Sequence, residues 1–349
     1  MKRAFLISVP ALILVVTCVL GVSAASAQSD PSTEDDPCPP PKVRTNVRPN
    51  ADGPATEVSV GVRMIDLLDI DDVSQTLTVD LGILRTWTDP RLAHLEGCEL
   101  SLDNVWYPEL VARNSGRLFE RWPREVSIGP EGRVKYIQRF YGTIASYHSL
   151  HDFPFDSQVI TVLLIPLKWA ENEVKLSVDD RFTGMAETLN ISDWIIESVE
   201  GEVGSQHVKA LNRVHSRYDF TITAHRIRAY YVWKIILPLC LIVAMSWCVF
   251  WIDPAAFGTQ IGLSATAFLT LIAFIFATTN MVPALGYFTL LDLFIGGATI
   301  LVFLALLESL GTSYLVSQEK SNLAMRIDRV CRILFPVSFA TIAAVVFIL

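Results

Sequence analysis

The stretch YDFTITAHRIRAYYVWKIILP, residues 218–238, joins two different kinds of sequence. Its first part alternates between apolar and polar side chains, which is the period of a half-buried β-strand. The alternation stops after Arg228, and residues 235–252 carry no charge. An uncharged apolar run of this length is typical of a helix that crosses a lipid bilayer. The stretch therefore predicts a β-domain on its amino-terminal side and membrane helices on its carboxy-terminal side.

The period of two also occurs in several segments upstream of this junction. Gly, Pro, Asp and Asn residues separate these segments, as expected for turns between antiparallel strands. Many short strands without helical periodicity predict a β-sandwich or a β-barrel. The clearest examples are TEVSVGVRM (56–64), TLTVDLGIL (76–84), RVKYIQRF (133–140) and EVKLSV (173–178).

The apolar sequence downstream of the junction is long enough for several membrane crossings. Residues 254–291 carry no charge and exceed the length of one span, but TTNMVPALG (278–286) provides a natural break. We therefore expect four helices. The third connection, 317–332, is basic, and basic connections usually remain cytoplasmic. The predicted helices span about 230–252, 257–280, 286–315 and 327–349, and the basic residues are Lys320, Arg326, Arg329 and Arg332.

The amino-terminal segment has the pattern of a secretory signal peptide. Two basic residues precede an apolar run, and Ala25-Ser26-Ala27 resembles a cleavage site. A retained membrane helix is the alternative. Residues 28–56 are rich in Pro, Asp, Ser and Thr and predict a flexible leader. The expected division is therefore a signal peptide at 1–27, a leader at 28–56, a β-domain at 57–228 and a transmembrane domain at 229–349.

Charge and cysteine usage exclude several classes of partner and site. The formal net charge is −8 and there is no basic stripe, so nucleic acid is not expected as a partner. No Cys or His spacing predicts a metal site, and no cofactor is expected. Cys38 and Cys98 both precede the membrane helices, where a disulfide between them is possible. No nucleophile–base pair or phosphate loop suggests an enzyme, so no catalytic residue is assigned.

The second predicted helix, TQIGLSATAFLTLIAFIFATTN (259–280), is unusually rich in hydroxyl and amide side chains. Polar groups in a bilayer are costly unless they face protein or water. Steps of four, three, four and three residues define one stripe along this helix. Several copies of the stripe could line a pore with an apolar constriction. The stripe consists of Gly262, Thr266, Leu269, Ala273 and Phe276.

Two alternatives to this interpretation of the stripe follow from general chemistry. The Ser and Thr hydroxyls could simply bond to carbonyls of their own helix. The helices could also anchor a membrane-bound binding or sensor module that has no conductance. An anchor has no use for a polar stripe, so the stripe favours a pore. One helix cannot enclose a pore, which implies a ring of subunits.

Taken in order, six motifs and the second predicted helix resemble the pentameric ligand-gated ion channels, the Cys-loop receptor superfamily, and especially its bacterial members. The resemblance covers residues 57–349. It implies an all-β immunoglobulin-like extracellular sandwich followed by an all-α four-helix transmembrane domain, assembled as a homopentamer in the cell (inner) membrane. The motifs are WTDPRL (87–92), WYPE (106–109), FPFD (153–156), RIRAYYVWKIILP (226–238), NMVPALGY (280–287) and CRILFP (331–336).

The resemblance places the FPFD loop at the membrane surface, between the β-domain and the pore. The two cysteines that close this loop in animal receptors would fall at Ser146 and Ile160. Asp156 or Asp71 is expected to pair with Arg226 in a partly buried site, where the loss of one partner is costly. The alternative is a tight turn with two core aromatics. The implied coupling residues are Asp71, Pro154, Phe155, Asp156, Arg226 and Pro283.

The resemblance also implies a ligand pocket between subunits, although its chemistry is open. Amine-binding relatives have a box of aromatic residues, which attracts cations. Gly82, Arg113 and Leu167 occupy positions where relatives often carry aromatics. Arg113 favours an anionic or zwitterionic agonist. All six His residues lie in the outer domain, so opening by protons is equally considered. The candidate ligand residues are Arg113, Leu167, Trp169, His207 and His215.

The inner mouth of the pore helix bears on ion selectivity. Cation-selective relatives usually carry an acid at the position of Thr259, where this chain has a neutral residue. The nearest acid is Asp253. The anion-selective pattern has an Arg at the position of Gln260, and this chain lacks it. The prediction is a channel for small ions, with cations favoured, that opens in response to a small ligand or a change in pH.

Overall fold

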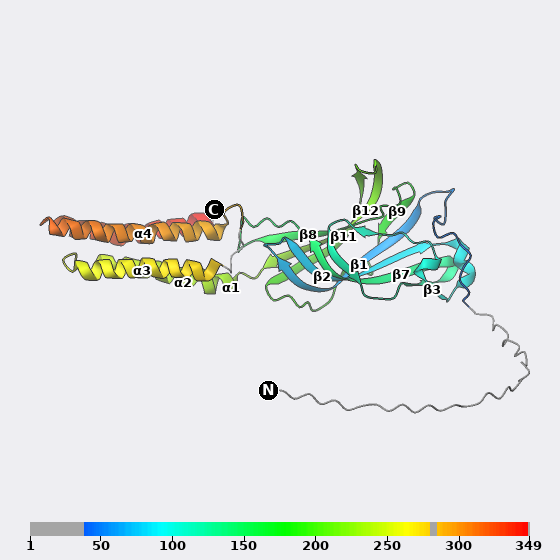
Figure 1. Cartoon of the computed structure of the whole chain (residues 1–349), viewed down its shortest axis with the longest axis horizontal. Helices are drawn as coiled ribbons and strands as arrows, with labels where there is room; N and C mark the ends of the chain where they lie inside the picture. The colour runs from blue at the N-terminus through cyan, green and yellow to red at the C-terminus, as the bar shows by residue number, and fades with distance from the viewer. Residues whose placement is uncertain (1–37, 280–284, 348–349) are drawn as a thin grey trace, which may run out of the picture. The chain divides into compact units, whose positions relative to one another are not determined.

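The computed structural model describes residues 38–279 and 285–347. Within these residues the β-domain forms two sheets, and Figure 1 labels strands β1, β2, β3, β7, β8, β9, β11 and β12. The larger sheet has eight strands in the order β10-β1-β2-β7-β6-β3, with β5 paired to β7 and β9 paired to β1. The smaller sheet has the order β11-β12-β8-β4.

The strand bounds follow the alternating segments of the sequence. The strands are β1 Thr56–Asp71, β2 Thr76–Thr88, β3 Glu99–Ser101, β4 Val111–Ala112, β5 Ser115–Glu120, β6 Glu125–Ile128, β7 Arg133–Ala145, β8 Ser157–Ile165, β9 Val174–Val178, β10 Gly184–Met185, β11 Trp194–Val208 and β12 Arg213–Arg226. Short helical turns lie between them at η1 Pro90–Leu95, η2 Leu102–Asn104 and η3 Pro130–Gly132.

The core of the β-domain is built from the apolar half of each alternation. Val60 in β1 and Trp87 in β2 come from the larger sheet, and Val162 in β8 and Phe220 in β12 come from the smaller one. All four side chains are buried. The burial of large apolar side chains is the main source of stability for such a domain.

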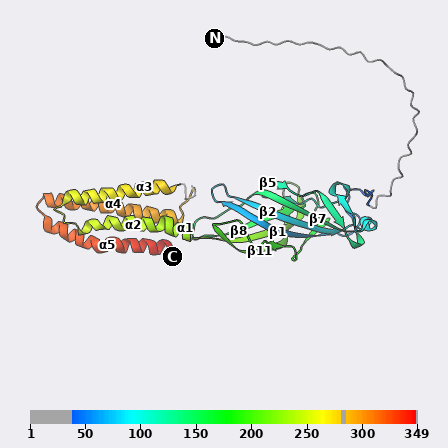
Figure 2. The same ribbon diagram turned by 90° about the horizontal axis from the view of Figure 1, so that it is seen from below.

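Four helices downstream are long and apolar enough to cross a membrane. Figure 2 shows α2, α3, α4 and α5 side by side, and a shared apolar cluster connects them. The predicted β-domain followed by four apolar helices is thus confirmed. The first span combines α1 Ala229–Tyr231, the π-turn η4 Val232–Ile236, α2 Leu237–Trp247 and η5 Cys248–Trp251; the others are α3 Phe257–Thr278, α4 Leu290–Ser317 and α5 Ser321–Phe347.

The ends of two helices differ from their predicted positions. Helix α4 begins at Leu290 instead of 286, because Thr289 and Asp292 form a reciprocal capping box there. Helix α5 begins at Ser321 instead of 327. Its first turns bury Ala324 and Asp328 on one face, so the helix continues beyond the uncharged run. Hydropathy alone therefore underestimates α5 at its polar end.

Residues 38–55 of the predicted flexible leader lie among the described residues, and hydrogen bonds of Arg48 and Arg91 hold part of them. Arg48 is buried, and its guanidinium donates to the carbonyl oxygens of Ala51, Gly53 and Pro54. Arg91 also donates to the carbonyl oxygen of Val47. These hydrogen bonds satisfy polar groups of the loop. Amino-acid composition alone cannot distinguish such a loop from a disordered one. The proposed signal peptide lies outside the described residues.

The cysteines of the described residues fall into two chemical classes. Cys38 and Cys98 are disulfide-bonded. Cys240, Cys248 and Cys331, which belong to the membrane helices, are free thiols. This distribution agrees with an oxidising environment for the β-domain.

Candidate functional site

The junction between the β-domain and the helices contains a buried ion cluster centred on Arg226, at the end of β12. Its Nε donates to Oδ1 of Asp156 at 2.8 Å, and its Nη2 contacts Oδ2 of Asp72 at 2.8 Å. Arg226 is 6% exposed, so both pairs are largely removed from water. One guanidinium thus connects the β1–β2 turn to the loop that precedes β8.

Strand register explains why these residues meet. Ser157 of β8 lies opposite His225 of β12, so the next positions outward are Asp156 and Arg226. On the other edge of β12, Arg226 lies opposite Trp194, and its guanidinium carbon is 4.2 Å from the centre of that ring. A cation above an aromatic face is stabilised further when it is desolvated.

Electrostatics keep this guanidinium charged despite its burial. Burial alone lowers the pKa of Arg226, but the hydrogen bond to Asp156 and the charge of Asp72 outweigh it and raise the pKa above its ordinary value. Gln158 donates to Oδ2 of Asp156 at 2.7 Å and to the carbonyl oxygen of Ser149 at 2.8 Å. The cluster therefore holds its own loop in place without a disulfide.

Asp71 does not take the role that the sequence suggested for it. Its Oδ1 accepts hydrogen bonds from the backbone N–H groups of Val73 and Ser74, at 2.9 and 3.0 Å. The Ser74 N–H bond is the main reason why the pKa of Asp71 lies below its ordinary value. Asp71 closes the β1–β2 turn, and its neighbour Asp72 is the second carboxylate on Arg226.

The FPFD loop is a tight turn whose aromatic rings pack against the first and last helices. Phe153 N–H donates to Leu150, and the Phe153–Pro154 peptide bond is cis. The Phe153 ring lies 4.8 Å from Tyr231, and the Phe155 ring lies 5.3 Å from Phe347. The motif is therefore a tight turn, as the alternative interpretation describes it, and it also contacts the first and last helices.

The same loop caps the amino terminus of α4. The N–H of Leu290 donates to the His151 carbonyl at 2.9 Å, and that of Leu291 donates to the Phe153 carbonyl at 3.2 Å. First-turn N–H groups have no partner within their own helix, so the loop supplies what α4 lacks. Tyr287 adds a hydroxyl that accepts from Leu150 N–H at 3.1 Å. Pro283, another expected coupling residue, lies outside the described residues.

The stripe on α3 lies on the outer surface of the single chain. All five of its residues are exposed, and Leu269 and Phe276 are 66% and 75% exposed. The hydroxyl of Thr266 donates to the Gly262 carbonyl at 2.7 Å, which is the back-bonding that the alternative predicts. The opposite face of α3 packs into the bundle through Gln260, Ser264, Ala267, Leu271 and Thr278.

The candidate ligand residues do not form a single site within one chain. Arg113, Leu167 and His207 are exposed. Trp169 is half-buried against Trp106, with ring centres 5.8 Å apart. His215 is fully buried, and its Nδ1 lies 2.8 Å from the Trp169 carbonyl oxygen. His215 and Trp169 are the pair that a hydrogen-bond contact brings together. The burial of His215 makes it a support for the Trp169 loop.

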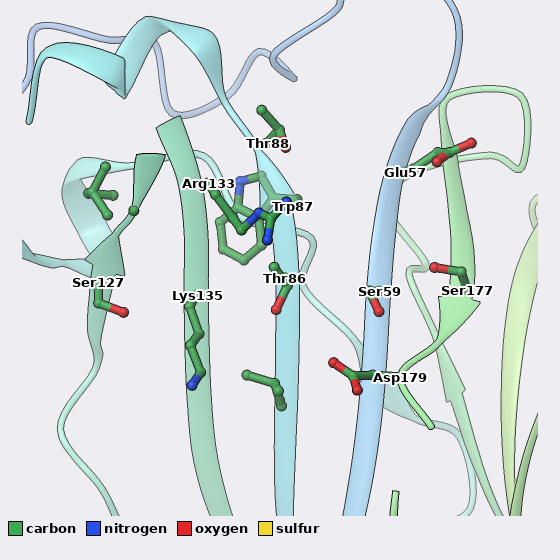
Figure 3. A pocket seen from close by; sticks show the side chains of 13 residues that line it. Glu57, Ser59, Thr86, Trp87, Thr88, Ser127, Arg133, Lys135, Ser177 and Asp179 are labelled. Atoms are coloured by element: carbon green, nitrogen blue, oxygen red, sulfur yellow. The ribbon is translucent and has the colours of Figure 1, made fainter. Parts of the chain in front are cut away.

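A trough of about 660 Å³ on the larger sheet was not identified from the sequence. Figure 3 shows Arg133 and Lys135 on one side and Glu57 and Asp179 on the other, with Thr86 between them. Within the described part of the chain, no ion pair joins these four charged side chains. Hydroxyl groups also line the trough, together with three apolar side chains. They come from Ser59, Thr86, Thr88, Ser127 and Ser177, and the apolar side chains are Leu84, Trp87 and Ile128.

Comparisons with known proteins point in one direction. The profile described as "Neurotransmitter-gated ion-channel ligand binding domain" matches residues 42–228, and that described as "Neurotransmitter-gated ion-channel transmembrane region" matches residues 235–322. A protein named "Proton-gated ion channel" from Gloeobacter violaceus is 28% identical over 297 residues, which cover 83% of this chain and 82% of that protein. The human gamma-aminobutyric acid receptor subunit rho-2 is 25% identical over 303 residues, covering 80% of this chain and 63% of that subunit.

Proposed function

The chain belongs to the neurotransmitter-gated ion-channel family, and from that membership we propose that it forms a ring-shaped channel for small ions. Its family consists of channels and not of enzymes, and its four candidate spans make it a multi-pass membrane protein. The observation that carries the proposal is the exposed stripe of α3. An apolar, threonine-containing face that is left uncovered by its own bundle needs another partner.

We propose that this partner is water inside a pore formed by five copies of α3. The bundle buries Leu271 on one face of α3 and leaves Leu269 exposed on the other. In a ring, Gly262 and Thr266 would line a wider, more polar part, and Leu269 and Phe276 an apolar constriction. Such a constriction closes to ions when it loses water and opens after a small widening.

The ion cluster and the FPFD loop are proposed to transmit the opening signal. Arg226 is followed directly by the first helix, and the loop bonded to its partner Asp156 caps α4. Movement of the β1–β2 turn would therefore reach both helices through Asp72. Pro154 and Phe155 lie within the FPFD loop, and Pro283 and Asp71 are proposed as further coupling residues.

The agonist is proposed to be a proton or a small anionic or zwitterionic molecule. The relatives named above are a proton-gated channel and a subunit of a gamma-aminobutyric acid receptor. The trough supports the zwitterion, because Arg133 and Lys135 line one side of it and Glu57 and Asp179 the other. The exposed residues Arg113, Leu167 and His207, together with the Trp169 loop and the buried His215 beneath it, are proposed as the rim of a pocket between subunits.

The charged residues near the ends of α3 and α5 bear on ion selectivity and on orientation in the membrane. Lys320, Arg326 and Arg329 lie at or near the start of α5, so we place this end in the cytoplasm and the β-domain outside the cell (inner) membrane. We propose cations as the permeant ions, since α3 carries no Lys or Arg and the exposed carboxylate of Asp253 precedes it.

Recording from the purified full chain in planar bilayers tests the function. The proposal expects ion currents that appear on acidification or on addition of a small amino acid. In a KCl gradient, the reversal potential should lie near that of potassium. Absence of current under every ligand and pH condition, from protein shown to be folded, would favour the alternative of a membrane-anchored sensor without conductance.

A further inference from the structure

His148 is a buried titratable side chain that the ion cluster leaves without a hydrogen bond. It lies in the loop after β7 and is 0% exposed. Neither of its ring nitrogens has a hydrogen-bond partner among the described residues. Its Nδ1 is 3.6 Å from Oδ1 of Asp72, which is also buried and unpartnered. A donor and an acceptor thus face each other at a distance slightly too long for a hydrogen bond.

The charges around His148 do not balance while its ring is neutral. Arg226 contributes one positive charge, and Asp72 and Asp156 contribute two negative charges, which leaves a buried cluster with one excess negative charge. An uncompensated buried charge is costly. The other groups that face the cluster are Gln158 from β8, Tyr231 from the first helix and Asp71 from the β1–β2 turn. The carboxylates of Asp69 in β1 and Asp193 before β11 also act on it electrostatically, through Asp72 and Tyr231.

We propose that His148 binds the proton that opens this channel. The inference rests on the proposed function and names the ligand and its site. A proton on Nδ1 makes the cluster neutral and turns the facing pair His148–Asp72 into an ion pair. His is suited to this role because it changes charge near physiological pH.

The position of His148 connects the bound proton to the start of the first helix and to the start of α4. Asp72 lies in the β1–β2 turn and holds Arg226, which leads into the first helix. His148 lies in the loop whose carbonyls at His151 and Phe153 cap α4. Attraction between the imidazolium and Asp72 therefore tightens the turn against the loop, and acid favours the open pore.

The direct test is the pH dependence of current in bilayers, without any other agonist, for the wild type and His148→Gln. The wild type is expected to activate as the pH falls through the range in which His titrates, about pH 7 to 5. The variant should need about tenfold more protons for half-activation, or lose the response. The matched control is His225→Gln, because His225 is exposed and already bonded to Glu197 at 2.6 Å.

A second measurement keeps the two proposals distinguishable, because it needs no conductance. The melting temperature of the detergent-solubilised full chain is followed between about pH 8 and pH 5 for the wild type, His148→Gln and His148→Asn. The wild type should gain stability over both variants as the pH falls. A gain in melting temperature of the wild type over both variants as the pH falls, without any current, would contradict the channel proposal and support the proton site.

Currents without a pH dependence that depends on His148 would contradict the proton site and leave the channel proposal unaffected. Currents evoked by a small amino acid, with the same pH dependence in the wild type and in His148→Gln, would leave the channel proposal intact. Identical melting profiles for the wild type and both variants would lead to the same conclusion. A response lost equally in His225→Gln would also overturn the assignment to His148.

Discussion

Arg226 and its two carboxylates are three charged groups largely removed from water. Asp156 contacts Arg226 through two hydrogen bonds, and Asp72 contacts its Nη2 as well. Replacing either carboxylate with a neutral amide weakens these charge-assisted contacts, which are stronger than hydrogen bonds between neutral groups. The stability of the junction should therefore depend strongly on these side chains.

Asp72→Asn and Asp156→Asn are each expected to lower the free energy of unfolding by about 1.5–3 kcal/mol, the usual contribution of a hydrogen bond to a charged group. Denaturant titration of the solubilised protein, followed by tryptophan fluorescence, measures the change. Asp71→Asn is the matched control, because Asp71 bonds only to its own turn in the described structure. Equal losses in Asp71→Asn and Asp72→Asn would contradict the placement of Asp72 in the cluster.

Asp71 gives a second, pH-dependent prediction. The N–H groups of Ser74 and Val73 lower its pKa in the folded state, so the carboxylate contributes stability above the unfolded pKa, near pH 4. This contribution is lost as the pH falls through the lower, folded pKa. The melting temperature of Asp71→Asn should therefore lie below that of the wild type at neutral pH and approach it in acid. A gap that stays constant down to about pH 2 would contradict this account.

Sequence reasoning found part of this cluster. The FPFD motif and the residues before the first helix gave Asp156 or Asp71 as the expected partner of Arg226. The sequence could not distinguish Asp71 from Asp72, because both are acids in one turn and no periodicity applies within a turn. The backbone decides, since Asp71 accepts the turn's own N–H groups.

At the scale of elements, the FPFD loop and the amino terminus of α4 form a hydrogen-bonded contact between the β-domain and the helices. The first two N–H groups of α4 bond to carbonyls of the loop, and Thr289 and Asp292 satisfy each other beside them. Apolar residues Leu150, Phe153, Ile235 and Leu291 form a cluster around these bonds. The loop and the helix end should therefore move together.

Tyr287→Phe is expected to alter gating without changing single-channel conductance. The substitution leaves the Leu150 N–H without its acceptor, a loss of about 1 kcal/mol, but does not touch the α3 stripe. Single-channel recording separates open probability from conductance. The matched control is Tyr314→Phe, since Tyr314 is exposed near the far end of α4. A changed conductance in Tyr287→Phe would place Tyr287 in the pore and contradict the coupling role.

The sequence predicted which elements exist better than where they end. Uncharged runs identified all four helices, because their length is set by the bilayer. The start of α4 depends instead on the capping box at Thr289, and the start of α5 depends on the burial of Ala324 and Asp328 in its polar first turns. A hydropathy profile detects neither a capping box nor the burial of single polar side chains.

At the scale of the whole molecule, the uncovered face of α3 predicts assembly. Leu269 and Phe276 are exposed in the single chain, although the helix around them is apolar. We expect native mass spectrometry of the detergent-solubilised protein to show a species with five times the mass of the chain. A stable monomer as the main species would contradict a ring-shaped pore.

The charged trough shows what the sequence could not predict at this scale. Ser59, Thr86 and Lys135 are far apart in the chain and become neighbours only through strand pairing. The candidate ligand residues were chosen from single motifs, and none of them lines this trough. A binding surface that spans several strands depends on register, which turn geometry and packing decide together.

The central claim is that the α3 stripe lines an ion-conducting pore, and Leu269→Ser tests it most directly in single-channel recordings. A hydroxyl group at the proposed constriction should hold water there, so the variant is expected to open at lower stimulus or to remain open. Leu304→Ser, on the exposed surface of α4, should leave currents unchanged. Currents that are identical in the wild type and in Leu269→Ser would contradict the account.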